Sequence, residues 1–249
     1  MISFELSPQQ KQIKELVHWF AKNEIRPIAM EADKNEKVPD EWLDKVNKMG
    51  IHLNASSFTG GGKKKEESNR SKKKERESNR MAVIATEEMA WGCPAIALSL
   101  PGAGLGGPPV QSSGTPEQKE RFLSIFKKDK PRWGAYALTE PEAGSDASGI
   151  RTTATKVDGG YILNGQKIFI TNGGRASWTV VFATIDRNLG RAGHRAFVVE
   201  KGTPGFTCTR VAKKMGLRAN ETAELLFEDC FVPDENLLGG EELYSSKDN

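Results

Sequence analysis

The chain has 249 residues and carries 36 Lys and Arg against 33 Asp and Glu, which gives a formal net charge of +3. Hydrophobic residues make up 37% of it, enough for a core, which argues against wholesale disorder or a coiled coil. Its three cysteines, Cys93, Cys208 and Cys230, lie far apart, which argues against a disulfide scaffold or a zinc ribbon and favours a reducing compartment. The N-terminus lacks the pattern of a signal or transit peptide, so we expect neither, and no apolar run has the ~20 residues that span a bilayer. We therefore expect a cytoplasmic protein, or a mitochondrial matrix protein if the source is eukaryotic.

Positive charge is concentrated in residues 60–80, which read GGGKKKEESNRSKKKERESNR and hold nine basic and four acidic residues. The rest of the chain, with 27 basic and 29 acidic residues, is slightly acidic. The segment has no apolar side chain to bury, so we predict a solvated and mostly disordered insertion, or at most a charged helix. Binding of nucleic acid or another anion is the alternative, and we expect no nucleic-acid partner.

Residues 1–131 are expected to form an N-terminal helical domain. Ser7-Pro8-Gln9-Gln10 is a capping-box signature, and apolar residues follow at helical spacing from Ile13 to Ala21. Pro27 is expected to kink or end this helix. Further helices are predicted over residues 39–49, 81–91, 94–100 and 116–126, with the glycine-rich stretch 101–109 as a loop between two of them.

Residues 132–249 are expected to form a second domain, a small antiparallel β-barrel, so that the fold class is α+β. Seven runs rich in β-branched and aromatic residues are separated by turn residues. Asp158-Gly159 is typical of a tight hairpin. The predicted strands are WGAYAL, TTATKV, YILNGQKIFIT, WTVVFATI, RAFVVEK, FTCTRV and ELLFEDCFV.

Several familiar chemistries find no support in the sequence. GAGLGG at 102–107 lacks the preceding strand of a dinucleotide fingerprint and runs into Pro108-Pro109. The three histidines have no partners at ligand spacing, so we predict no metal site. No GxSxG, P-loop or paired-carboxylate pattern occurs.

Two segments stand out for their polar content. Tyr136–Asp146 runs from a strand into a loop of small residues, which exposes hydroxyls and backbone N–H groups at a sheet edge. By residue type alone this is most simply an unusual turn. In Asn164–Gly173, strand alternation places Phe169 and Thr171 on one face, where a planar ring could stack on the first and hydrogen-bond to the second.

Together these segments resemble the acyl-CoA dehydrogenase family. TEPEAGSD is similar to its TEPxAGSD signature and NGQKIFITNGG to its NGxKxWITNG signature. The stretch from TPGFTCTRV to ENLLG also follows the family order, and the resemblance covers residues 81–240 and the first helices. Two departures stand out. NASSFTGGGKKK stands where the family has a PEEYGG-like turn, and because the sequence ends at Asn249 we expect this chain to lack the family's C-terminal helical domain.

The resemblance implies an FAD-dependent oxidation of an acyl-CoA thioester, with a glutamate as the base and the hydride passing to flavin N5. That glutamate would lie beyond residue 249, so no catalytic residue is assigned here and the chain alone is expected to be inactive. Ser145 would contact the CoA part of the substrate in addition to the cofactor. An electron-transfer flavoprotein would accept the electrons, and the full-length enzyme would be a homo-oligomer. The residues implied to bind the cofactor are Tyr136, Ala137, Leu138, Thr139, Gly144, Ser145, Phe169, Ile170 and Thr171.

Two other functions remain open at this point. One is an acyl-CoA oxidase or a nitroalkane oxidase-like flavoenzyme on the same fold. The other is a non-catalytic fragment that acts within an assembly.

Overall fold

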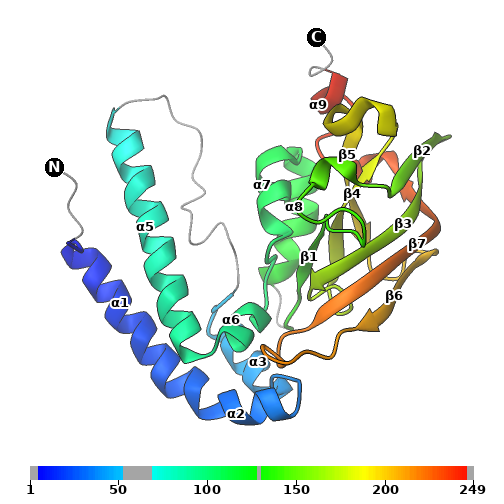
Figure 1. Ribbon diagram of the computed structural model, residues 1–249. Helices are drawn as coiled ribbons and strands as arrows, with labels where there is room; N and C mark the ends of the chain where they lie inside the picture. The colour runs from blue at the N-terminus through cyan, green and yellow to red at the C-terminus, as the bar shows by residue number, and fades with distance from the viewer. Residues whose placement is uncertain (1–4, 53–68, 128–129, 246–249) are drawn as a thin grey trace.

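The computed structural model describes residues 5–52, 69–127 and 130–245, with the backbone only at 69–78 and 127. Its first half is helical and its second half is a curved sheet, and helices α1 and α5 extend side by side away from that sheet (Figure 1). The α+β fold class is therefore confirmed. No helix in the described ranges is both long enough and apolar enough to cross a membrane.

The first helix does not end at Pro27. α1 (Pro8–Phe20) starts at the predicted capping box, in which Ser7 Oγ accepts the Gln10 amide at 3.2 Å. One π-helical turn (Ala21–Ile25) then leads directly into α2 (Arg26–Lys34). Pro27 cannot make the normal helical hydrogen bond to the carbonyl four residues earlier. The wider π-helical turn before it accommodates the proline ring.

The remaining helices follow the predictions with two differences. α3 (Asp40–Lys48), α6 (Pro94–Ser99) and α8 (Pro116–Leu123) occupy the predicted places. α5 (Asn69–Gly92) begins earlier than predicted and takes in residues 69–80 of the charged segment, whereas residues 60–68 lie outside the described residues. The start of α7 (Gly107–Ser113) was predicted as part of the loop 101–109, but its two prolines lie in the first turn of the helix. The N–H groups of a first turn have no acceptor within the helix, so a proline there breaks no hydrogen bond.

The sheet contains the seven predicted strands and is mixed, so the prediction of a purely antiparallel barrel was wrong. β1 runs parallel to β4, which also makes one parallel pair with β2, and the other pairings are antiparallel. The chain passes through the β2–β3 hairpin before it returns as β4 beside β1, and this long connection permits the parallel pairing. The strands are β1 (Gly134–Ala137), β2 (Thr153–Val157), β3 (Gly160–Thr171), β4 (Trp178–Thr184), β5 (His194–Glu200), β6 (Phe206–Val211) and β7 (Thr222–Pro233).

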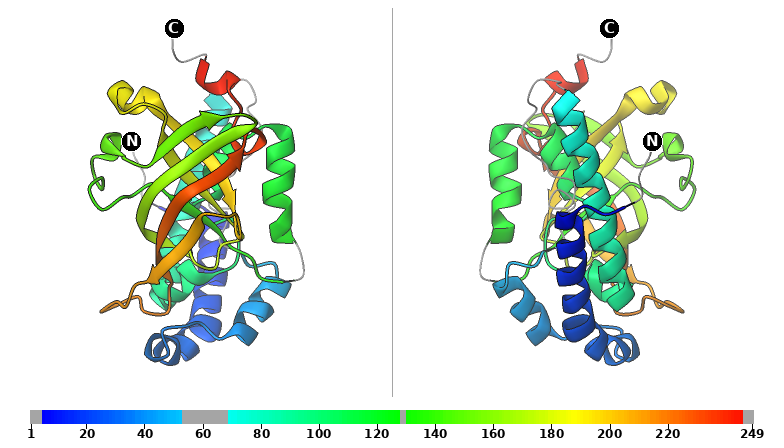
Figure 2. Two further views of the ribbon diagram at one scale, coloured as in Figure 1. Left: turned by 90° about the vertical axis from the view of Figure 1, so that its right-hand side faces the viewer. Right: turned by 90° about the vertical axis from the view of Figure 1, so that its left-hand side faces the viewer.

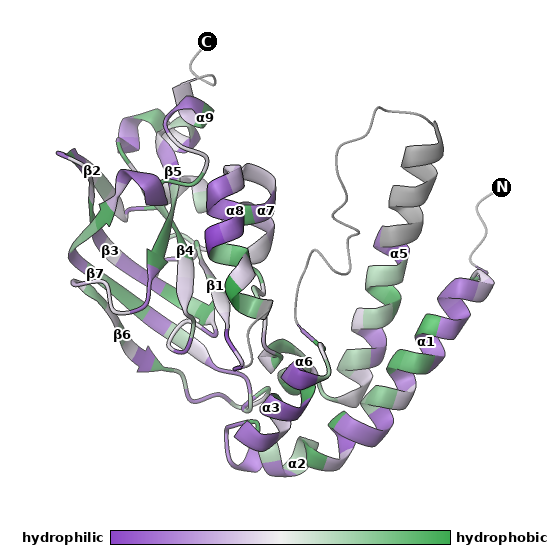
Figure 3. Cartoon of the chain, turned by 180° about the vertical axis from the view of Figure 1, so that it is seen from behind, coloured by the Kyte–Doolittle hydropathy of each residue, from purple (hydrophilic) through white to green (hydrophobic). Residues whose placement is uncertain are grey.

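Buried residues lie on both faces of the sheet. The inner face encloses one apolar cluster that includes Leu163, Val181 and Leu225, and apolar and polar residues alternate along β3 and β7 (Figure 3). The outer face of β4 and β5 packs against α7 and α8, which lie along one side of the sheet (Figure 2). A third cluster joins α1, α3 and α6.

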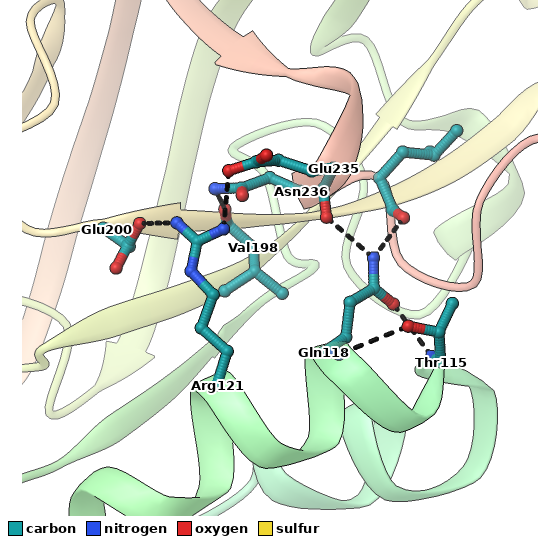
Figure 4. A network of polar contacts seen from close by, with 8 residues as sticks. Thr115, Gln118, Arg121, Val198, Glu200, Glu235 and Asn236 are labelled. Carbon is teal, nitrogen blue, oxygen red and sulfur yellow. Dashed lines mark hydrogen bonds and ion pairs between the residues drawn. The ribbon is translucent and has the colours of Figure 1, made fainter.

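Polar contacts attach α8 to the sheet. The Gln118 amide group donates to the carbonyls of Glu235 (2.9 Å) and Leu237 (2.7 Å) (Figure 4). One turn further on, Arg121 pairs with the carboxylates of Glu200 and Glu235. These contacts and the apolar face of the helix fix the outer side of β5.

Candidate functional site

The candidate site is built around a loop, residues 138–151, which we call the signature loop because it contains TEPEAGSD. β1 pairs with β4 as far as Ala137 opposite Val181, and the chain then leaves the sheet. It returns at Thr152, whose carbonyl accepts the Thr184 amide at 2.8 Å. Both ends of the loop are thus held by β4, three residues apart on that strand.

The Glu140 side chain closes the base of the signature loop. Its carboxylate accepts the backbone amides of Arg151 at 2.5 Å and Thr152 at 3.0 Å. It also pairs with the Lys167 ammonium group at 2.7 Å. The side chains of Glu140 and Lys167 are 4% and 0% exposed, so this ion pair lies inside the protein.

Both charges of this pair are strongly affected by burial. Burial alone would raise the pKa of the Glu140 carboxyl, but the hydrogen bonds from Lys167, Thr152 and Arg151 outweigh it and the pKa lies below its ordinary value. Burial lowers the pKa of Lys167, and the hydrogen bond and charge of Glu140 oppose that shift. Glu140 is therefore an ionised, fully hydrogen-bonded carboxylate, which makes it a poor acceptor for a substrate proton.

The structure brings the two signature segments together. Lys167 also donates to the Leu138 carbonyl at 3.0 Å, and the Ile168 amide donates to the Thr139 carbonyl at 2.9 Å. Residues 138–139 of the loop therefore lie directly beside residues 167–168 of β3. These two hydrogen bonds hold the two predicted site segments next to each other.

Phe169 has an unusual conformation. Its φ is +58°, a left-handed value that is an outlier for a bulky residue, and the residue is 70% exposed. The register between β3 and β7 shifts here, because the four residues Lys167–Ile170 lie opposite only three residues of β7, from Ala223 to Leu225. This bulge interrupts the regular alternation from which a shared face for Phe169 and Thr171 was predicted.

The other predicted contact residues fall into two groups. The side chains of Ala137 and Ile170 belong to the inner core, so a ligand can reach them only through their backbone. The Tyr136 ring packs on Phe182 at 5.1 Å, and Gly144 and Ser145 are exposed. Within the described residues, the hydroxyls of Thr139, Ser145 and Thr171 have no hydrogen-bonding partner, so they are available to a ligand.

Analysis of the sequence missed one feature of this site, the partner of Lys167. A lysine inside a strand is normally solvent-exposed, and its partner lies 27 positions earlier in the chain. The only available signal was a charged residue at an inward position of the strand pattern. Among the described residues, no group of three or more His, Cys, Asp or Glu is placed to hold a metal ion.

Comparison with known proteins identifies the family. Residues 7–126 match the model of the acyl-CoA dehydrogenase N-terminal domain, and residues 135–230 match that of the middle domain. A short-chain-specific acyl-CoA dehydrogenase of Clostridium acetobutylicum is 37% identical over 96% of this chain and 60% of its own length.

Solved structures give the same result. The structure of butyryl-CoA dehydrogenase from Megasphaera elsdenii matches with a TM-score of 0.77 and 38% identity, over 96% of this chain and 61% of that one. A glutaryl-CoA dehydrogenase of Mycobacterium smegmatis in complex with FADH2 matches with a TM-score of 0.75 and 26% identity, over 97% and 58%. The chain spans about 60% of the length of the curated relatives it matches. These matches cover both halves of the fold, and the chain belongs to the acyl-CoA dehydrogenase family.

Proposed function

We propose that this chain supplies the helical and sheet walls of an FAD-dependent acyl-CoA dehydrogenase. The observation that carries the proposal is the exposed, strained Phe169 beside the signature loop. Backbone strain of this kind is concentrated at ligand sites, where it fixes a side chain in a position that packing alone does not require. An exposed aromatic ring is also a surface on which a planar cofactor can stack.

The residues present fit a flavin. The Phe169 ring would cover part of its planar face, and the Thr139 and Thr171 hydroxyls, which have no partner in the described part of the chain, would hydrogen-bond to its polar edge. A Cβ at Gly144 would meet nothing within 4 Å, so the fold itself does not require a glycine at this position. The missing side chain would instead let the ligand approach the loop closely. When bound, FAD supplies the oxidant that accepts the hydride from the substrate.

The chain's own part in the reaction would be binding and orientation. Ser145, exposed at the tip of the loop, would hold the CoA portion of the substrate. The two carboxylates of the loop do not offer a base, because Glu140 is buried in an ion pair and Glu142 is paired with Arg151 on the surface. We further propose that the full-length enzyme is a homo-oligomer in the cytoplasm or mitochondrial matrix and passes its electrons to an electron-transfer flavoprotein.

The test is FAD binding by the purified chain, followed by the quenching of flavin fluorescence. Phe169→Ala is expected to weaken binding by about tenfold, since one aromatic contact contributes roughly 0.5–1.5 kcal/mol beyond the area it buries. Phe231→Ala is the matched control, because Phe231 is a second exposed aromatic of the same sheet, 42% exposed and outside both signature segments. Equal effects of the two substitutions would count against the proposal.

A further inference from the structure

The start of the signature loop depends on contacts with β3, whereas its far end is also held by Arg187, which donates to the Arg151 carbonyl at 2.9 Å. The backbone of residues 138–140 extends past the last β1–β4 pair, so these residues have no partner on β4. Their position depends instead on β3, through the bonds from Lys167 to Leu138 and from Ile168 to Thr139. A reciprocal pair of backbone bonds between Glu140 and Ala143 makes the turn that follows.

One carboxylate connects three separate pieces of chain. Through Glu140, the start of the loop is joined to its end at Arg151 and Thr152 and to the middle of β3 at Lys167. We call these contacts the Glu140–Lys167 clasp. A pair of apolar side chains could occupy the same volume without loss of stability, but it could not accept two amides or donate to the Leu138 carbonyl.

We propose that the Glu140–Lys167 clasp positions the flavin wall, and that neither residue takes part in the chemistry. The inference rests on the proposed function. Glu140 directly follows Thr139, and Lys167 lies two residues before Phe169. The clasp therefore sets the distance between these two predicted contact residues. A site of this kind requires its contact groups to be held within fractions of an ångström, which a flexible loop does not provide.

The first measurement compares stability with FAD affinity in variants of the full chain. Lys167→Met leaves the Glu140 carboxylate buried without its cation and is expected to lower both. In the double variant Glu140→Gln/Lys167→Met neither charge is left unpaired, so stability recovers. FAD affinity is expected to stay about tenfold below that of the unaltered chain, because the links between loop and strand are still missing.

The control is Val198→Ala. Val198 is fully buried against α8 on the outer face of the sheet, so its truncation lowers stability without touching the signature loop. Its FAD affinity is expected to remain within about twofold of that of the unaltered chain once the folded fraction is allowed for. Recovery of affinity in the double variant, or an equal loss in Val198→Ala, would overturn the proposal.

The second measurement needs no cofactor. Amide hydrogen exchange is expected to accelerate in the double variant at Ile168 and at one or both of Arg151 and Thr152. A glutamine side chain offers one acceptor oxygen where the Glu140 carboxylate offers two, so at least one of these two amides loses its acceptor. The same amides should exchange at the rate of the unaltered chain in Val198→Ala after correction for global stability. If the unaltered chain binds no FAD, the proposed function fails, and this exchange measurement alone decides whether the clasp holds the loop. Unchanged protection of the three amides in the double variant would then reject it.

Discussion

The Arg175 guanidinium lies over the ring of Trp133, with its central carbon 4.3 Å from the ring centroid. Trp133 directly precedes β1 and Arg175 follows the second signature segment, so this contact joins the two strands that carry the site. Arg175 also donates to Asn172 Oδ1 at 2.6 Å, and the Trp133 indole donates to the Ser99 carbonyl at 3.0 Å. The contact therefore also ties the end of β3 to helix α6.

Replacing this half-buried arginine is expected to destabilise the chain. Burial lowers the pKa of Arg175 to about 10, although the charges of Glu221 and Asp40 oppose this shift. Lysine lacks the planar fork that stacks on the ring and bonds Asn172, so Arg175→Lys should lower the free energy of unfolding by about 1–3 kcal/mol. Urea denaturation measures this difference.

Arg26→Lys is the control for that substitution. Arg26 lies over Trp91 at 4.6 Å, but both side chains are exposed. An exposed cation–π contact contributes only about 0.5–1 kcal/mol. A loss in Arg26→Lys as large as that in Arg175→Lys would show that burial is not the cause.

Helix α8 offers a second comparison between a buried and an exposed contact, both shown in Figure 4. Gln118→Leu removes the donor for two backbone carbonyls and the acceptor for the amides of Thr115 and Gly239. The expected loss is about 2–4 kcal/mol of the free energy of unfolding, since groups buried without partners are expensive. Arg121→Met breaks two ion pairs at an arginine side chain that is 41% exposed. It should lower the free energy of unfolding by less than about 1 kcal/mol. The reverse order in urea denaturation would contradict this account.

The pattern of residues predicted the strands well, because period-two burial and turn residues are local signals. The direction of the pairing between β1 and β4 could not be predicted, since it depends on how the chain crosses between distant strands. α7 was missed because Pro108 and Pro109 were taken as helix breakers, although prolines are tolerated in a first turn.

The candidate site was predicted in outline but not in detail. The signature segments indicated which residues gather there, and the bonds at Leu138 and Thr139 bring those segments together. The left-handed φ of Phe169 could not be read from the sequence, because it arises from a one-residue bulge against β7. The Glu140–Lys167 clasp was also missed, since it needs a lysine inside the sheet.

The stability of the chain is expected to fall between about pH 7.5 and 5.5 because of two histidines. Burial lowers the pKa of His52 and of His194 below the ordinary value of 6.5, and their hydrogen bonds to Asn47 and Ser148 only partly oppose it. As the pH falls through 6.5, the unfolded chain therefore takes up protons before the folded chain does, which favours unfolding. The double variant His52→Gln/His194→Gln should show a smaller drop in thermal unfolding experiments across this range. An unchanged drop would place its cause elsewhere.

The chain alone is expected to give no acyl-CoA-dependent bleaching of added FAD. Removal of a proton next to a thioester carbonyl needs a base within hydrogen-bond reach, and such a base contributes about 10²–10⁴-fold to the rate. Glu140 is excluded by its burial and by its three hydrogen bonds, and Glu142 is held by Arg151 with 59% of its side chain in solvent. The measurement is flavin absorbance with excess FAD and a panel of acyl-CoAs, before and after a relative's C-terminal helical domain is supplied in trans. Bleaching only after that addition would agree with this prediction. Bleaching by the chain alone that persists in Glu140→Gln but is lost in Glu142→Gln would contradict it and identify Glu142 as the base.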